Sequence, residues 1–244
     1  MQTLAAFLSL LLPLLATAAT IDEDVERYIG VFRGDKAFHA AVAETLGWTG
    51  LSDPRLYDVI EERLLADYPM RKDVKAERQR LAWYIRALGF SGQDKYLPTI
   101  NKFLEDHDYA TYSRRALVDL PKYKKWNPII SDRKSFDAKL SDDGNRAINM
   151  IRADDFQLKE IGAKRVYFGH LRDEPIFEVL AAEVRSSYPG ATSSNNDEIA
   201  WMVRALASSG QEKYRPVVQE VADKTTDEKI GRHARSSLDS FPRR

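Results

Sequence analysis

Residues 81–96 read LAWYIRALGFSGQDKY, and residues 199–214 read IAWMVRALASSGQEKY. Ten of these 16 aligned positions are identical, with no gap and an offset of 118 residues. Upstream, residues 56–60 (LYDVI) pair with residues 176–180 (IFEVL) at an offset of 120. Self-similarity over this length indicates that the chain contains an internal duplication.

Each copy has the periodicity of helices. Leu81, Tyr84, Ile85 and Leu88 follow the i, i+3, i+4, i+7 spacing of one helix face, and no segment alternates convincingly with period two. Several predicted helices are apolar on more than one face, as stacking between neighbouring hairpins requires. The sequence therefore predicts an all-α superhelix of about six helical hairpins, divided into units at residues 20–140 and 141–244 that form one continuous solenoid.

A second set of positions resembles the HEAT repeat, in which a helix begins near proline and the next helix carries arginine, alanine and leucine after an aspartate turn. The residues in the first copy are Pro98, Asp108, Arg114, Ala116 and Leu117. Those in the second copy are Pro216, Asp227, Arg232 and Ala234, with Arg235 in place of the leucine. The resemblance implies a HEAT-like or armadillo-like α-solenoid.

The N-terminus has the pattern of an export signal. No charged residue occurs from Thr3 to Ala19, and the apolar run ends in small residues before a polar, acidic start at Thr20. We expect a signal peptide over residues 1–19, cleavage near Ala18 or Ala19, and a periplasmic or secreted product without a stable membrane anchor. An uncleaved N-terminal anchor is the alternative.

Composition excludes several classes of chemistry. The 244 residues include 37 Lys and Arg, 37 Asp and Glu, and no cysteine. The absence of cysteine excludes disulfides, thiolate metal sites and a cysteine nucleophile. A net charge of zero gives no support to a nucleic-acid partner, and we expect none.

We find no enzyme signature, and we expect no catalytic residue, metal or cofactor. The four histidines are His39, His107, His170 and His233, and none has a convincing metal-ligand spacing. We expect all four to be solvated. Gly89 and Gly92 belong to a turn between helices and do not form a nucleophile elbow.

The candidate binding residues are Trp83, Arg86, Trp201 and Arg204, which occupy equivalent positions in the two copies. Tryptophan and arginine three residues apart on a helix can form a cation–π pair, and both are typical of binding hot spots. The alternative is that they pack between adjacent hairpins, since duplicated structure retains duplicated packing.

Residues 122–139 are basic and contain three aromatic side chains. Pro121 precedes this segment, Pro128 lies within it, and the second unit follows it. A segment of this kind can bind nucleic acid or an anionic polymer. Its place at the unit boundary favours a solvated connector.

From these observations we expect a scaffold that binds a protein or peptide partner on the concave surface and has no catalytic activity of its own. The alternative is an α/α-helical enzyme that acts on an envelope polymer. A third hypothesis, nucleic-acid binding, requires that the charges of residues 122–139 join a continuous basic face and that the protein is retained in the cytoplasm. The oligomeric state stays open.

Overall fold

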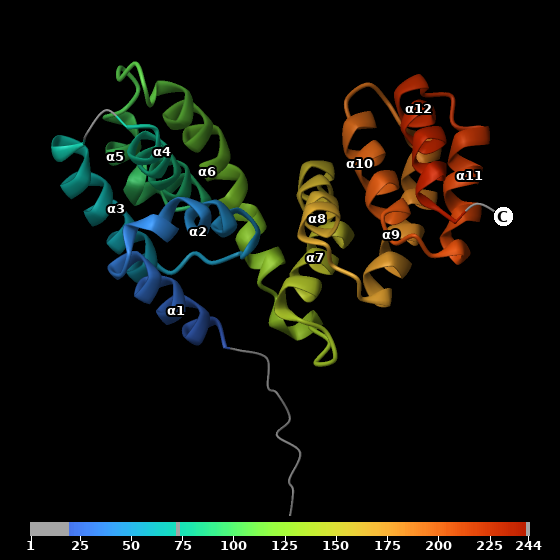
Figure 1. Ribbon diagram of the computed structural model, residues 1–244, viewed down its shortest axis with the longest axis horizontal. Coiled ribbons are helices and arrows are strands. Elements are labelled where there is room, and N and C mark those ends of the chain that lie inside the picture. The colour runs from blue at the N-terminus through green and yellow to red at the C-terminus, as the bar shows by residue number, and fades with distance from the viewer. Residues whose placement is uncertain (1–19, 72–73, 243–244) are drawn as a thin grey trace, which may run out of the picture.

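The computed structural model describes residues 20–71 and 74–242, and within these residues the regular structure is entirely helical. Figure 1 shows two groups of helices, α1 to α6 and α7 to α12, joined where the end of α6 meets α7. The first group comprises α1 (Ile21–Arg33), α2 (His39–Thr45), α3 (Pro54–Asp67), α4 (Lys75–Phe90), α5 (Leu97–Asn101) and α6 (Ala110–Ile130), with the short 3-10 helix η2 (Leu46–Trp48) after α2. The second comprises α7 (Asp142–Arg152), α8 (Phe156–Gly169), α9 (Glu174–Ser187), α10 (Asn196–Ala207), α11 (Arg215–Lys224) and α12 (Glu228–Ser237). The predicted all-α superhelix is confirmed.

The two groups repeat the same packing. In the first group α3 packs against α1, and α4 packs against both α2 and α6. In the second, α9 packs against α7, and α10 packs against both α8 and α12. The central helices α4 and α10 therefore bury two faces each, which is why their sequences carry broad apolar stripes.

Turn and cap residues fix the ends of these helices. Asp53 caps α3 by accepting a hydrogen bond from the Arg55 N–H at 2.9 Å, and Pro54 occupies the first turn. After α4 and α10 the chain turns through Gly92 and Gly210, whose φ angles of 68° and 64° lie in the left-handed region. The glycines are therefore repeated because the turn geometry requires them.

One repeated pair of side chains has a clear packing role. The Tyr96 hydroxyl donates a hydrogen bond to Asp58 Oδ1 at 2.8 Å, and the Tyr214 hydroxyl donates to Glu178 Oε1 at 2.9 Å. In each copy the preceding lysine also contacts that carboxylate, with Nζ–O distances of 2.6 and 2.7 Å. The lysine–tyrosine pair thus holds the turn after the central helix to the helix before it.

The predicted connector over residues 122–139 is wrong in its first part. Helix α6 continues through both Pro121 and Pro128, and Tyr123 and Trp126 are buried. Each proline removes one helix hydrogen bond, but the two prolines are seven residues apart and both are exposed. Packing of the buried aromatic side chains compensates for the lost hydrogen bonds, so the helix does not end there.

The apolar core forms two clusters that share two helices. Met150 of α7 and Leu158 of α8 pack with the first cluster, whereas Ile151 of α7 and Val166 of α8 pack with the second. Helices α7 and α8 thus contribute to both cores. The boundary between residues 140 and 141 stays a prediction.

The expected signal peptide, residues 1–19, lies outside the described residues. The first described residue, Thr20, caps α1 through a capping box with Glu23. Among the described residues, no helix combines the length and the apolar character needed to cross a membrane.

Candidate functional site

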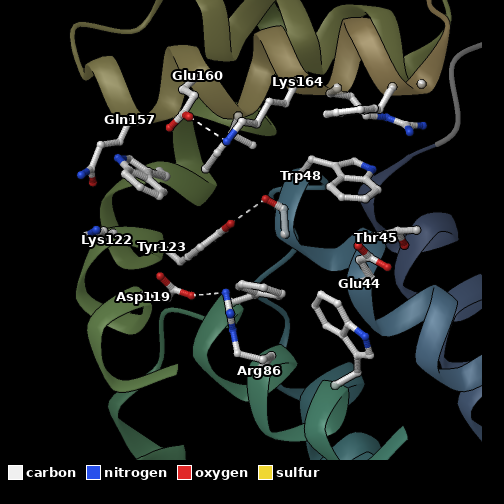
Figure 2. Close-up of a pocket in the computed structure, with 18 of the residues that line it drawn as sticks. Glu44, Thr45, Trp48, Arg86, Asp119, Lys122, Tyr123, Gln157, Glu160 and Lys164 are labelled. Atoms are coloured by element: carbon white, nitrogen blue, oxygen red, sulfur yellow. Dashed lines mark hydrogen bonds and ion pairs between the residues drawn. The ribbon is translucent and has the colours of Figure 1, made fainter. Parts of the chain in front are cut away.

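A cavity of about 760 Å³ lies where the first helical group faces α8, and we refer to it as the central cavity. Side chains from α2, η2, α4, α6 and α8 line it (Figure 2). Its volume is within the range of small-molecule sites. Helices of both groups therefore line one potential ligand site.

Aromatic rings form much of the wall. Trp48, Trp83 and Trp126 line the central cavity together with Tyr123 and other rings. The Tyr123 hydroxyl donates a hydrogen bond to the Gly47 carbonyl at 2.8 Å, and the Trp126 ring centroid is 5.3 Å from that of Tyr123. These contacts fix the orientation of the rings, so the aromatic wall is preformed.

The aromatic wall continues through Phe90, whose ring centroid lies 4.8 Å from that of Tyr123. On the opposite side, Phe168 of α8 lines the central cavity with 62% of its surface exposed. An exposed phenylalanine at the edge of a cavity is available to contact a ligand.

The charged groups of the central cavity are mostly neutralised within the protein. Arg86 donates to Asp119 Oδ2 at 2.6 Å, and Lys164 lies 2.7 Å from Glu160 Oε1. Figure 2 shows these two ion pairs on opposite sides of the cavity. The Arg165 guanidinium is paired with Asp143 of α7. Its central carbon lies 4.9 Å from the centroid of the Trp48 ring. The walls therefore present hydrogen-bonding groups beside aromatic faces, and most of their charged groups are paired; Glu44 and Lys122 line the cavity without an ion pair among the described residues.

Asp119 lines the central cavity, and its acidity is altered. Burial raises the pKa of the Asp119 carboxyl above its usual value, although the Arg86 guanidinium acts in the opposite direction. Desolvation disfavours the ionised carboxylate. A carboxyl group of this kind in a cavity is a candidate proton donor.

A second aromatic group lies beside the central cavity, and we refer to Tyr167, Phe168, Trp201 and Arg204 as the outer patch. The Phe168 ring centroid lies 5.6 Å from that of Trp201. The Arg204 guanidinium carbon lies 4.2 Å from the Trp201 centroid and 5.1 Å from the Tyr167 centroid. Phe168 therefore belongs to both the outer patch and the wall of the central cavity.

The structure separates the four predicted binding residues into two places. Trp83 and Arg86 line the central cavity, whereas Trp201 and Arg204 lie in the outer patch. The predicted cation–π pair is confirmed for Trp201 and Arg204, while Arg86 instead lies 5.2 Å from the Phe90 centroid. That these residues bind a partner stays a prediction.

Sequence reasoning did not assign Trp48 to a site, and it considered Trp126 only as part of the basic segment 122–139. Trp48 and Trp126 lie outside the closely matched repeat, and nothing in their spacing places them near Trp83. The scarcity of tryptophan was an available signal, since the chain has four and three of them line this cavity.

The expectation of four solvated histidines is wrong for His39. Its side chain is fully buried, and its Nδ1 is hydrogen-bonded to the Tyr84 hydroxyl. Burial lowers the pKa of His39, which favours the neutral imidazole. The ring packs edge-on against Phe32, so its role is in the core. Over the described ranges, no group of three or more histidine, aspartate or glutamate side chains is placed to hold a metal ion.

Comparisons with known proteins give a weak structural similarity. No protein-family model matches the chain, and no curated protein matches it. Among solved structures, the chain is similar to human deoxyhypusine hydroxylase in complex with glycerol, with a TM-score of 0.37 and 13% identity over 90% of this chain and 84% of that chain. The helices of the described residues agree with the predicted all-α fold.

This comparison corrects the predicted function. We expected a scaffold that binds a protein or peptide and has no catalytic activity, but the similar solved structure is, by its name, that of a hydroxylase. The prediction failed because it derived a function from repeat architecture, whereas function depends on the chemistry of a site carried by the fold.

Proposed function

We propose that the protein binds a saccharide in the central cavity. The observation that carries the proposal is that the half-buried rings of Trp48 and Trp83 line one cavity, with the buried Trp126 in its wall and hydrogen-bonding side chains beside them. A pyranose ring has an apolar C–H face and a rim of hydroxyl groups. Indole faces suit the first, and polar side chains suit the second.

The pairing of Arg86 and Lys164 with carboxylates favours a ligand whose part in this cavity carries no charge. Arg86 and Lys164 each have a carboxylate partner within 2.7 Å. A guanidinium or carboxylate whose charge is already compensated still offers hydrogen-bond sites to hydroxyl groups. A charged ligand would have to compete with these internal pairs, whereas a hydroxyl group would add to them.

An exported location is part of the proposal, because envelope and extracellular material is rich in saccharides. The apolar run that ends at Ala19 supports it, as does the helix cap at Thr20, which lets the folded part begin directly after the expected cleavage point. Cell fractionation and N-terminal sequencing of the purified protein test this. A mature protein that begins near Thr20 in the exported fraction is expected, and a cytoplasmic protein that retains Met1 would contradict it.

Binding is tested with an oligosaccharide array followed by calorimetry on the best member. Trp48→Ala removes a half-buried ring of the central cavity and is expected to weaken binding about fivefold or more, if stacking of a sugar is worth about 1–3 kcal/mol, as stacking of a planar base on an aromatic side chain is. The matched control is Phe38→Ala, which removes an exposed ring outside the cavity. Equal affinities for the two variants, or no binding by the wild type, would refute the proposal.

A second candidate function is hydrolysis of the bound saccharide, and Asp119 is the observation that favours it. A carboxyl group with a raised pKa can donate a proton to a leaving group. Mass spectrometry of an incubated oligosaccharide is the test. Shorter products that disappear in Asp119→Asn are expected for a hydrolase, and an unchanged oligosaccharide would leave binding as the function.

A further inference from the structure

The outer patch is the repeat-equivalent of one side of the central cavity. At the offset of 118, Trp83 and Arg86 correspond to Trp201 and Arg204. At the upstream offset of 120, Trp48 corresponds to Phe168. The backbone supports this second pairing, because the chain adopts a left-handed conformation two residues later in both copies, at Gly50 and His170 (φ 70° and 52°). Both places thus combine a tryptophan, an arginine and a second aromatic ring.

The two copies differ in the partner of the arginine. Arg86 is paired with Asp119 of α6, and the residue at the same offset in α12 is Ser237. Arg204 has no carboxylate within ion-pair distance among the residues that the structure describes, and its close contacts are the Trp201 and Tyr167 rings. The charge that is neutralised in the first copy is therefore uncompensated in the second.

The surroundings of Arg204 are consistent with a local excess of positive charge. The His233 imidazole of α12 has a lowered pKa, first because of burial and then because of the nearby Arg204, Arg232 and Lys229. Asp197 is the carboxylate that opposes this effect, and it is itself paired with Lys229 at a short distance. The Arg204 guanidinium is half-buried, so its charge is screened less than that of a fully exposed arginine.

The outer patch is continuous with the central cavity. Phe168 lines the cavity and contacts Trp201. Lys164 also lines the cavity, and its ammonium nitrogen lies 4.9 Å from the Trp201 centroid. A chain of sugar residues that leaves the central cavity along α8 would reach Arg204 next.

We propose that Arg204, Trp201 and Phe168 form a second subsite that binds an acidic sugar residue of the same saccharide. This inference rests on the proposed function, and it narrows the ligand to an oligosaccharide that carries carboxylate or phosphate groups. The aromatic rings would contact the sugar faces. The exposed edge of the guanidinium would donate paired hydrogen bonds to the anionic group.

The experiment uses the whole protein as purified from its own fraction, on an array that holds neutral, uronate-containing and phosphorylated oligosaccharides. The wild type is expected to bind acidic oligosaccharides more tightly than neutral ones. Comparison of its affinities for the uronate-containing and the phosphorylated oligosaccharides shows which anionic group it selects. Arg204→Gln is expected to weaken binding of the best acidic member about tenfold or more while leaving neutral members unchanged. The matched control is Arg152→Gln, which removes the same charge from an exposed position outside both sites.

A second variant reverses the difference between the copies. Ser237→Asp places a carboxylate where the first copy has one, and it is expected to reduce the preference for acidic members as Arg204→Gln does. If the wild type binds neutral and acidic members equally, or if Arg204→Gln keeps full acidic affinity, the second subsite is refuted while the central cavity remains. If no member binds, the proposed function itself fails.

Discussion

The most informative test of the architecture is Asp24→Ala at the junction of the two helical groups. The Asp24 side chain is 1% exposed, and its carboxylate accepts hydrogen bonds from Arg133 at 2.8 Å and from Arg146 of α7. Arg146 is itself buried, with a side-chain exposure of 5%. This carboxylate therefore ties α1 to the start of the second helical group.

Removal of one partner from a buried ion pair costs about 3–5 kcal/mol, because the remaining charge is left without compensation. We expect the lower end, about 3 kcal/mol, since Asp142 lies 2.9 Å from Arg133 and 3.9 Å from Arg146 and would retain part of the pairing. In a protein of this size that loss corresponds to a fall in Tm of about 6–12 °C. Urea denaturation followed by circular dichroism measures the free energy of unfolding.

Asp22→Ala is the matched control. Asp22 is on the same helix and pairs with Arg55, but its side chain is 70% exposed, so the expected loss is below about 1 kcal/mol. A difference of less than about 0.5 kcal/mol between the two variants would refute the reasoning. Asp24→Leu combined with Arg146→Leu should recover much of the stability, because no buried charge is then left unpaired.

Three further predictions concern the cavity and its supporting helices. Trp83→Ala is expected to lower the free energy of unfolding by about 1–3 kcal/mol and to abolish saccharide binding, because the ring is half-buried against the core and also lines the central cavity; a variant that melts like the wild type would show that the ring does not support the core. Gly89→Val is expected to cost more than about 2 kcal/mol in urea denaturation, because a Cβ there would lie 2.6 Å from the Ala116 carbonyl oxygen, and Gly190→Ala, at an open position, is the neutral control. Asp119→Asn is expected to change the pH dependence of stability. The raised pKa means that the folded state holds the proton more tightly, so the wild type loses stability as the pH rises from the unfolded pKa through the folded pKa, and the variant should not show that loss; identical pH profiles of the free energy of unfolding would contradict it.

The sequence was a good guide to the fold because the fold depends on local signals that are repeated. The apolar spacing around Leu81, the cap at Asp53 and the turn glycine at Gly92 each act over a few residues, and the structure retains all of them. Helix α6 is the exception. Pro121 and Pro128 are local signals for a helix end, and they are overridden by burial of aromatic side chains that only the tertiary structure brings together.

The site was less predictable for the same physical reason. Trp48 and Trp126 are separated from each other by most of the first unit, and only the approach of α8 makes them walls of one cavity. The repeated Trp83 and Trp201 could be found from the sequence. Their surroundings could not be found, because the neighbours of each tryptophan depend on which helices face it in the folded protein.

Divergence between the two copies points to function more directly than their identity does. The lysine–tyrosine pair is kept in both copies with the same carboxylate contact, as expected for residues that hold the repeat together. The arginine is also kept, but Asp119 in one copy is Ser237 in the other. A change that leaves Arg204 without an acidic partner gives no packing advantage, because an uncompensated, half-buried guanidinium is costly in isolation. An anionic ligand would supply the missing charge, and the same argument predicts that such a ligand raises the Tm of the wild type more than it raises the Tm of Ser237→Asp.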